Sequence, residues 1–580
     1  MRSAWTEIYP VFERSFLNLN HISSASRDVH TLVVEAIGRL VADGTFPAEP
    51  LPDFIVEIPA DRSHGDFASN VAMVCAKPLR MAPRKIAEAI AGAVILDGSP
   101  FRKVEIAGPG FMNFYLASGW YEDVLKNVLD EGADYGKTAS GNGKRVLVEF
   151  VSANPTGPMH VGNARGGAIG DCLSSVLETA GYAVEREFYI NDAGNQIEKF
   201  ATSLEVRYLQ KCGEPIEMPE DAYQGADIVA HAEAFFAEHG DKYRDAEKQA
   251  RRDALVAFAL PKNIQGLKDD LGQYRIQYDT WFPESTLHAD GSVQRIIEQL
   301  KESGYTYEND GALWFKAQEL GADKDFVIVR SNGIPTYVVP DIAYHYNKLV
   351  TRGFDRAIDI LGADHHGYVP RLKAALTALG VDASRLTVVL MQMVAVMRDG
   401  KPVKQSKRSG KALTLITLLE DIPVDAARFF FNLREANSHF EFDLDLAVEQ
   451  SSSNPVYYVQ YAHARICSLL RNLTDAGIPT PDAAAADLSL LDSVPERELT
   501  RKLAMLPEEI DVAARQLDPS ALTKYSVELA ALFHKFYDAC KVRDAESEAL
   551  RDARIILCTA ARQVLGNVLA LLKVSAPEKM

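Results

Sequence analysis

The most constraining feature of the sequence is a strand–loop–helix–strand pattern over residues 144–190. KRVLVEFV (144–151) is rich in apolar and β-branched residues, and AVEREFYI (183–190) has a similar character. Between them lie a loop with prolines and a glycine, and a helical stretch from His160 to about Ala180. Two strands joined by a helical crossover run parallel, since the crossover returns the chain to the same end of the sheet. The pattern therefore predicts a parallel sheet covered by helices.

Further strand candidates extend this sheet domain toward residue 400. They are DFVIVR (325–330), AIDILGA (357–363) and RLTVVLMQM (385–393). The segment from about 195 to 275 is charged and helical with few strand signals, so we interpret it as an insertion. We therefore predict a Rossmann-like parallel-sheet domain over residues 140–400 and a connecting region over 401–454.

Units of different character flank the sheet domain. Residues 26–120 combine a helical period with the strand–turn–strand segment KVEIAGPGFMNFYL, which indicates a small α+β domain. From Pro455 the strand signals stop and apolar residues recur at helical spacing, which predicts an all-α helical bundle over 455–580. Residues 1–25 show no period and form an N-terminal extension. The predicted fold class is multidomain α/β.

Composition narrows the classes of protein further. The chain has 580 residues and 47% hydrophobic residues, enough to bury several cores, and 62 basic against 80 acidic residues give a net charge of −18. An acidic chain is not a general nucleic-acid coat, although a local basic track can still hold one RNA. The sequence has neither a long apolar run nor a signal peptide's apolar stretch, so we expect no membrane partner, a cytoplasmic location and a monomer.

A candidate nucleotide site lies in EFVSANPTGPMHVGNARGGAIGD (149–171), which leads from a strand end into a helix. Ligands of parallel sheets bind at this edge, beside the positively polarised helix N-terminus. Gly157 and Gly162 leave room for a nucleotide. His160 and Asn163 are three residues apart on the opening turn, so both side chains can donate hydrogen bonds to phosphate oxygens. The alternative is a tight turn with a surface histidine, but the complete string favours the nucleotide site.

A second segment, MRDGKPVKQSKRSGKALTL (397–415), concentrates positive charge. It follows the last predicted strand of the sheet, and its cations are Lys401, Lys404, Lys407, Arg408 and Lys411. A flexible cationic loop can stabilise developing negative charge, such as that of a leaving pyrophosphate. The alternative is a solvated basic surface loop, which the position after a sheet strand in an acidic protein disfavours.

The two segments resemble motifs of a known family. HVGN within ANPTGPMHVGN resembles the HIGH signature of class I aminoacyl-tRNA synthetases, and KQSKR (404–408) resembles their KMSKS loop. Asn163 stands at the second histidine of HIGH, and Gln405 and Arg408 replace the methionine and the last serine of KMSKS. HGDFASNVAM, FYINDAGNQI, LGADHHGYVPRLKAAL, VYYVQYAHARICSLLRN and VSAPEKM are similar to bacterial-type arginyl-tRNA synthetases, over about residues 26–580.

The resemblance implies an arginine–tRNA ligase. Such an enzyme activates L-arginine with ATP, giving arginyl-adenylate and pyrophosphate, and transfers arginine to the 3′-terminal adenosine of tRNA(Arg). Its ATP would act with Mg²⁺, and the resemblance implies no permanently bound cofactor. The alternatives are another class I synthetase and a non-catalytic tRNA-binding paralogue. A binder would need none of His160, Lys404, Lys407 and Asp341, so their retention favours an enzyme.

Roles in the reaction chemistry follow from the same resemblance. The expected catalytic residues are His160, Asn163, Lys404 and Lys407. The expected ATP-binding residues are these four with Gly157, Gly162, Gly362, Asp364 and His366. The expected arginine-binding residues are Glu149, Asn154, Tyr337, Asp341 and Asp364. A guanidinium is best met by carboxylates, so we expect Asp341 to face it, with Tyr337 as an aromatic wall. Asp341 could instead cap the helix that follows Pro340.

Contacts with tRNA and metal complete the expectations. Phe67 and Asn70 of the N-terminal domain, and Tyr461 and Arg465 of the helical domain, are the expected tRNA-binding residues. All four could instead serve packing or surface charge. We expect no metal site, because the adjacent histidines of GADHHG have no third ligand at local spacing.

Overall fold

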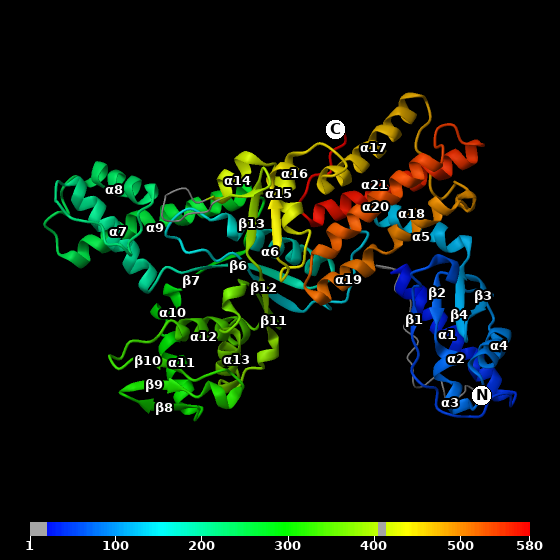
Figure 1. Cartoon of the computed structure of the whole chain (residues 1–580), viewed down its shortest axis with the longest axis horizontal. Coiled ribbons are helices and arrows are strands. Elements are labelled where there is room, and N and C mark those ends of the chain that lie inside the picture. Colours follow the sequence, from blue (N-terminus) through cyan, green and yellow to red (C-terminus); the bar gives the residue numbers. More distant parts are fainter. Residues whose placement is uncertain (1–19, 404–412) are drawn as a thin grey trace.

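The computed structural model describes residues 20–403 and 413–580 (Figure 1). The molecule is elongated, with a sheet at its centre, a helical arm at one end and the N-terminal domain at the other. The C-terminal helices lie beside the sheet, on the side of the N-terminal domain. This arrangement leaves one edge of the central sheet between the outer parts of the chain, where the predicted site residues can meet.

The central sheet has five parallel strands in the order β12-β11-β5-β6-β7. Their bounds are Leu386–Met391 (β12), Arg356–Gly362 (β11), Arg145–Glu149 (β5), Ala183–Ile190 (β6) and Thr280–Pro283 (β7). The crossover from β5 to β6 is α6 (Val161–Thr179), as the sequence pattern predicts. The predicted multidomain α/β fold class is confirmed.

The predicted strand at 325–330 forms but does not join this sheet. It is β10 (Phe326–Val329), which pairs antiparallel with β9 (Ala312–Phe315), and β9 pairs antiparallel with β8 (Thr306–Asn309). The short link between β9 and β10 holds only a 3₁₀ turn, whereas parallel neighbours need a long crossover. The edge position of the central sheet is taken by β7, a strand that the sequence patterns did not predict.

Two helical layers surround the sheet domain. The predicted insertion is a three-helix arm with its own core, formed by α7 (Asn195–Lys211), α8 (Ala226–His239) and α9 (Lys248–Gln273). Between the sheets lie α10 (Ser285–Ala289), α11 (Ser292–Glu302), α12 (Val338–Tyr346) and α13 (Val369–Ala378). A π-helical turn, Asn347–Thr351, continues α12 toward β11.

The N-terminal domain is α+β, as predicted. A four-stranded antiparallel sheet, β1-β2-β4-β3, is packed by α1 (His21–Ala42) and α4 (Pro83–Ala93). The strands are Val56–Glu57 (β1), Phe67–Ser69 (β2), Phe101–Ala107 (β3) and Phe111–Leu116 (β4), and two short helices are Val71–Val74 (α2) and Ala76–Leu79 (α3). The helix α5 (Ser118–Glu131) leads into the sheet domain.

After β12 the chain forms a small sheet and then only helices. The sheet joins β13 (Val394–Arg398), β14 (Lys401–Pro402) and β15 (Phe440–Asp443), with α14 (Leu415–Asp421), α15 (Val424–Phe431) and α16 (Leu444–Val448) around it. The bundle consists of α17 (Pro455–Asp475), α18 (Val494–Ala504), α19 (Leu506–Gln516), α20 (Ser520–Ala539) and α21 (Glu548–Leu571).

One helix in the described part of the chain, α21, is long and apolar enough to cross a membrane. The structure buries 61% of its apolar window among the other helices of the bundle. Buried residues such as Ile556, Leu565 and Val568 face that core. The apolar character of α21 is therefore accounted for by packing inside the bundle.

Candidate active site

The HVGN segment lies at the N-terminus of α6, where the sequence pattern places it. His160 is the N-cap in extended geometry, and its Nδ1 accepts a hydrogen bond from the Gly162 N–H at 3.1 Å. The Asn163 N–H donates to the His160 carbonyl at 2.9 Å. A Cβ added at Gly162 would meet His160 Nδ1 at 3.5 Å as its nearest neighbour. With Nδ1 capping the helix, a phosphate contact by His160 would use Nε2.

The same loop pairs with the end of the cationic segment. His160 and Thr414 form an isolated antiparallel bridge. The Val161 N–H donates to the Leu413 carbonyl, and the Leu415 N–H donates to the Met159 carbonyl, both at 2.9 Å. Lys404 and Lys407 lie outside the described residues. The chain leaving the cationic segment is nevertheless hydrogen bonded to the predicted nucleotide-binding loop.

The helical arm also touches this loop. Asn263 of α9 donates from Nδ2 to the Pro155 carbonyl at 3.0 Å, and its Oδ1 lies 2.7 Å from His231 Nε2 of α8. A Cβ added at Gly157 would lie 3.4 Å from Asp227 Oδ2. The arm therefore supports the loop from outside the sheet, and Asp227 is its nearest side chain to Gly157.

Predicted ATP-binding residues of β11 and predicted arginine-binding residues of β5 lie at the carboxyl ends of these two strands. Gly362 ends β11, and Asp364 and His366 follow it as exposed residues. Glu149 ends the neighbouring strand β5, and the exposed Asn154 follows in the loop. Because β5 and β11 are parallel neighbours, their carboxyl ends meet. These residues therefore lie at the carboxyl end of the sheet, where the loop after β5 leads into the N-terminus of α6.

The predicted guanidinium pocket lies at the start of α12. Tyr337 is the N-cap residue and is 73% exposed, and its ring lies 6.2 Å from the Tyr368 ring at an interplanar angle of 27°. Asp341 follows in the first turn of α12, and its side chain is 30% exposed. The i, i+4 spacing places Tyr337 and Asp341 on one helix face. An accessible carboxylate beside aromatic rings suits a planar cation.

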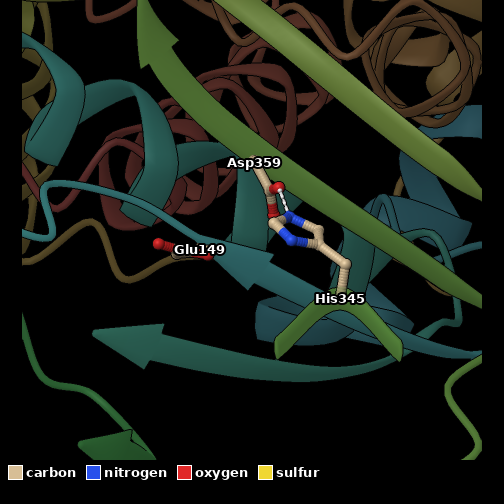
Figure 2. Close-up of side chains that lie close together, drawn as sticks. All are labelled: Glu149, His345 and Asp359. Atoms are coloured by element: carbon tan, nitrogen blue, oxygen red, sulfur yellow. Dashed lines mark hydrogen bonds and ion pairs between the residues drawn. The ribbon is translucent and has the colours of Figure 1, made fainter. Parts of the chain in front are cut away.

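A largely buried ion-pair network connects Asp341 with Glu149. Its five members are, in order of contact, Asp341, His345, Asp359, Lys348 and Glu149. The His345 ring lies 3.2 Å from Asp341 Oδ1 through Nδ1. Its Nε2 lies 2.7 Å from Asp359 Oδ2, the contact drawn in Figure 2. Lys348 Nζ lies 2.8 Å from Asp359 Oδ1 and 2.5 Å from Glu149 Oε2. The side chains of His345, Lys348, Asp359 and Glu149 are at most 8% exposed.

Charge balance within the buried ion-pair network shifts its pKa values. Burial opposes the positive charge of His345, but Asp359 and Asp341 outweigh it and raise the pKa of His345 to about 10. Burial also opposes the charge of Asp341, yet His345 holds the pKa of that carboxyl below its usual value. Lys348 and His345 lower the pKa of Asp359 in the same way. Asp341, His345 and Asp359 are therefore ionised at neutral pH.

Ion pairing rather than metal binding accounts for this group. In the described ranges, Glu149, His345 and Asp359 are the one set of three side chains whose ligand atoms lie within 4.8 Å of one another. Lys348 Nζ already contacts two of these side chains, and a metal would require a neutral His345. An ammonium thus occupies the place where a cation would otherwise sit.

His345, Lys348 and Asp359 were not among the predicted site residues, but the sequence carried a signal. Asp341, His345, Lys348 and Arg352 follow i, i+4, i+7, i+11, which places four charged residues along one face of a mostly buried helix. Acids also stand within apolar strands at Asp359, in AIDILGA, and at Glu187, in AVEREFYI. Buried charges of this kind need partners of opposite charge. The basic residues on this helix face pair with the acids of the strands: His345 and Lys348 with Asp359, and Arg352 with Glu187.

The tRNA-contact residues fall into two groups. The prediction for Phe67 is wrong, because its side chain is 2% exposed and packs edge-to-face on Phe101 in the core. A strand alternation cannot reveal that both faces of β2 are buried. Asn70 instead lines a surface cavity of about 250 Å³ with Ile55 and Met73, and its Oδ1 accepts from the Ile55 N–H at 2.9 Å.

The bundle residues lie in an aromatic cluster. Tyr461 is 39% exposed, and its ring stacks on Tyr457 at 6.1 Å and on His534 at 6.0 Å. The Arg465 guanidinium lies 4.1 Å from the Tyr537 ring centroid. Stacked rings with a guanidinium are the groups that RNA-binding surfaces present to bases and phosphates.

Comparisons with known proteins cover nearly the whole chain. Residues 27–116 match the N-terminal domain of arginyl-tRNA synthetases, 124–466 match the class I tRNA synthetase (R) catalytic domain, and 459–580 match the DALR anticodon binding domain. The arginine–tRNA ligase of Caldanaerobacter subterraneus subsp. tengcongensis is 53% identical over 97% of this chain and 100% of that protein. That of Acetivibrio thermocellus is 50% identical over the same shares.

Structural comparison agrees with the sequence matches. The Thermus thermophilus arginyl-tRNA synthetase superposes with a TM-score of 0.71 at 23% identity, covering 96% of this chain and 100% of that one, which supports the fold. The resemblance predicted from the motifs is thereby confirmed. With three matching domains in the family's order and half of its residues shared with two full-length relatives, the chain belongs to the arginyl-tRNA synthetases, a family of class I aminoacyl-tRNA synthetases.

Proposed function

We propose that this chain is an arginine–tRNA ligase that works in two steps. The carboxylate of L-arginine attacks the α-phosphorus of ATP, which forms arginyl-adenylate and releases pyrophosphate. A hydroxyl of the 3′-terminal adenosine of tRNA(Arg) then attacks the arginyl carbonyl and releases AMP. Both steps depend on positioning and charge neutralisation more than on covalent chemistry by a side chain.

The observation that carries the proposal is the backbone pairing of the N-terminus of α6 with the chain that leaves the cationic segment, in which the Val161 N–H donates to the Leu413 carbonyl. The accessible Asp341 on α12 is connected through ion pairs to Glu149, which ends the strand that leads into α6. A helix N-terminus suits phosphate, a cationic loop suits pyrophosphate, and a carboxylate suits a guanidinium. A tRNA-binding protein without catalysis would need none of this arrangement.

Residue roles follow from these positions. In the proposal, His160 and Asn163 contact ATP phosphates, Gly157 and Gly162 give the nucleotide room, and Gly362, Asp364 and His366 contact the ribose and the adenylate. Lys404 and Lys407 neutralise the leaving pyrophosphate. Asp341 binds the guanidinium beside Tyr337, while Glu149, Asn154 and Asp364 bind the amino-acid end of arginine.

Mg²⁺ would enter with ATP and supply positive charge to its phosphates. The buried ion-pair network does not suit it, since Mg²⁺ prefers octahedral oxygen ligands and Lys348 already pairs with Glu149 and Asp359. We therefore assign Mg²⁺ to the substrate, where it would neutralise phosphate charge, and to no dedicated protein site.

Domain roles complete the proposal. Residues 26–120 would bind the tRNA body through Asn70, residues 140–400 and 401–454 would carry the chemistry, and 455–580 would bind the anticodon through Tyr461 and Arg465. The enzyme would act as a cytoplasmic monomer. The predicted extension is shorter than residues 1–25, because α1 begins at His21 and Ile22 and Ala25 are buried in the N-terminal domain.

The test is a charging assay with the full-length chain. Purified protein is incubated with ATP, Mg²⁺, tRNA and each of several labelled amino acids. Among the amino acids tested, we expect only labelled arginine to be attached to tRNA, and we expect no charging when ATP is omitted. Charging with a different amino acid would identify another class I synthetase, and tRNA binding without charging would identify a paralogue; either result overturns the proposal.

A further inference from the structure

We propose that His345 and Lys348 are positioning residues that fix the two arginine-binding carboxylates, Asp341 and Glu149, through one shared partner, Asp359. The inference rests on the proposed function, because it concerns how the same site holds arginine. The carboxylate proposed for the guanidinium, Asp341, and the carboxylate proposed for the amino-acid end, Glu149, are thereby held in fixed positions relative to each other. Neither His345 nor Lys348 would touch the substrate.

The geometry forms an unbroken series of contacts. Asp341 pairs with His345 at 3.2 Å, His345 with Asp359 at 2.7 Å, Asp359 with Lys348 at 2.8 Å, and Lys348 with Glu149 at 2.5 Å. Asp341 is the accessible member, with 30% of its side chain exposed, whereas the Lys348 and Asp359 side chains are 0% and 2% exposed. The buried members therefore hold the two carboxylates from behind.

The register of the central strands sets the positions of the acidic residues. Glu149 of β5 stands directly beside Asp359 of β11 on one side and Glu187 of β6 on the other. Three acids on adjacent central strands repel one another unless cations lie between them. Lys348 supplies one cation, and Arg352 supplies another, with Nη1 2.5 Å from Glu187 Oε2.

The π-helical turn places Lys348. Its defining bond runs from the Arg352 N–H to the Asn347 carbonyl, five residues back, at 2.8 Å. Lys348 lies inside this turn with its Nζ 4.1 Å from the Tyr344 ring centroid, so the ammonium is fixed by a ring as well as by two carboxylates. Single π turns inside helices are rare and are frequent at functional sites.

His345 must be doubly protonated in this position. Nε2 faces Asp359 Oδ2, and Nδ1 faces both the carboxylate and, at 2.8 Å, the backbone carbonyl of Asp341. Acceptors at both ring nitrogens require two N–H donors, which only the imidazolium has. Tyr344 and Lys348 of its own helix and Glu149 of β5 also lie near the ring. Glu187 of β6 acts on Lys348, and Tyr368 before α13 acts on Asp341.

The test replaces His345 by glutamine, which keeps a hydrogen-bonding side chain and removes the cation. In tRNA charging assays we expect H345Q to raise the arginine KM by roughly 10- to 100-fold, in the range seen for supporting residues around other binding groups. The ATP KM should change less than about twofold. KM is independent of the folded fraction, so partial misfolding does not obscure the result.

The pH profile separates positioning from damage. Without the cation, the pKa of the Asp341 carboxyl is no longer held below its usual value, so the ratio of variant to wild-type arginine KM should grow as pH falls from 6 toward 5. A general structural defect would leave that ratio constant.

The matched control is H21Q, because His21 is a 5% exposed histidine in the N-terminal domain, hydrogen bonded to Asn127 at 2.9 Å.

A second variant and the wild type keep the test decisive. D359N preserves shape and removes the shared charge, so it should also raise the arginine KM selectively. The wild-type arginine KM should show no histidine titration between pH 6 and 8. Unchanged arginine KM in H345Q and D359N, or a wild-type break near pH 6.5 that H345Q removes, would overturn the inference. Wild-type protein that charges no arginine would instead overturn the proposed function.

Discussion

His160 and Thr414 face each other in an antiparallel bridge, although one precedes and the other follows almost the whole sheet domain. The bridge is reinforced on both sides by the backbone hydrogen bonds of Val161 with Leu413 and of Leu415 with Met159. In the proposed reaction, the loop with His160 and the cationic loop act on one triphosphate. The bridge joins the first loop to the stem of the second through backbone hydrogen bonds.

Val161→Pro tests this backbone link. Val161 is the first residue of α6, where proline fits, and His160 is already extended (φ −80°, ψ 149°), as a residue before proline must be. The substitution removes the N–H that donates to Leu413, a bond worth about 1 kcal/mol. We expect kcat/KM for ATP to fall about fivefold. Val161→Ala keeps the N–H and serves as the control; an equal loss in both variants would contradict the link.

Asp341→Asn tests the guanidinium subsite. The amide keeps the size of the side chain but removes the charge that meets the guanidinium and pairs with His345 at 3.2 Å. Removing one charge-assisted partner costs about 1.5–3 kcal/mol, so the arginine KM should rise by roughly 10- to 100-fold. The ATP KM, measured in the same charging assay, should hardly change. Equal increases in both constants would refute the assignment of Asp341 to arginine.

Regular patterns made the frame of this protein predictable. β6 occupies residues 183–190 as expected, because alternation and composition are local properties. β10 was placed in the wrong sheet, since partner choice depends on the length of the link to β9. The sequence patterns did not predict the buried ion-pair network, although its basic helix residues and its acidic strand residues can each be recognised in the sequence. Only the fold shows that Lys348 lies over Glu149 and Asp359, and no periodicity encodes that contact.

Lys407→Ala tests the cationic loop, whose lysines lie outside the described residues. If Lys407 neutralises the leaving pyrophosphate, its loss should lower kcat by about 10²–10³, the range for removing one preorganised donor to a transition state. Rapid-quench measurement of one turnover would report the chemical step directly. Lys316→Ala, at a surface lysine 3.7 Å from Glu319, is the control. A rate near wild type would exclude Lys407 from catalysis.

Arg428→Met tests how the bundle is joined to the sheet domain. Arg428 of α15 is fully buried; it pairs with Asp171 of α6 at 2.5 Å and donates to the carbonyls of Tyr274 and Leu572 at 2.9 and 3.2 Å. Burial opposes its charge, yet the pKa of Arg428 stays raised because acidic neighbours, Asp171 among them, outweigh burial. Breaking such a pair leaves a buried carboxylate and costs about 3–5 kcal/mol.

Calorimetric unfolding measures this cost. The transition that contains α6 and the bundle should move to clearly lower temperature in Arg428→Met. Arg275→Met is the control, because Arg275 pairs with Asp425 at 2.5 Å but is 43% exposed, and exposed pairs contribute at most about 1 kcal/mol. Equal shifts in the two variants would show that burial does not set the strength of the Arg428 contact.

Asn70→Asp tests the proposed tRNA contact of the N-terminal domain. The aspartate keeps the Oδ1 acceptor for the Ile55 N–H, so the local fold is retained, but it replaces an amide donor by a negative charge facing the cavity with Met73. Repulsion of the phosphate backbone should raise the tRNA KM by about tenfold at low salt and less at high salt. Phe67→Leu is the contrasting variant: this core ring should affect stability while leaving the tRNA KM unchanged. If Asn70→Asp leaves the tRNA KM at the wild-type value at low salt, Asn70 has no part in tRNA binding.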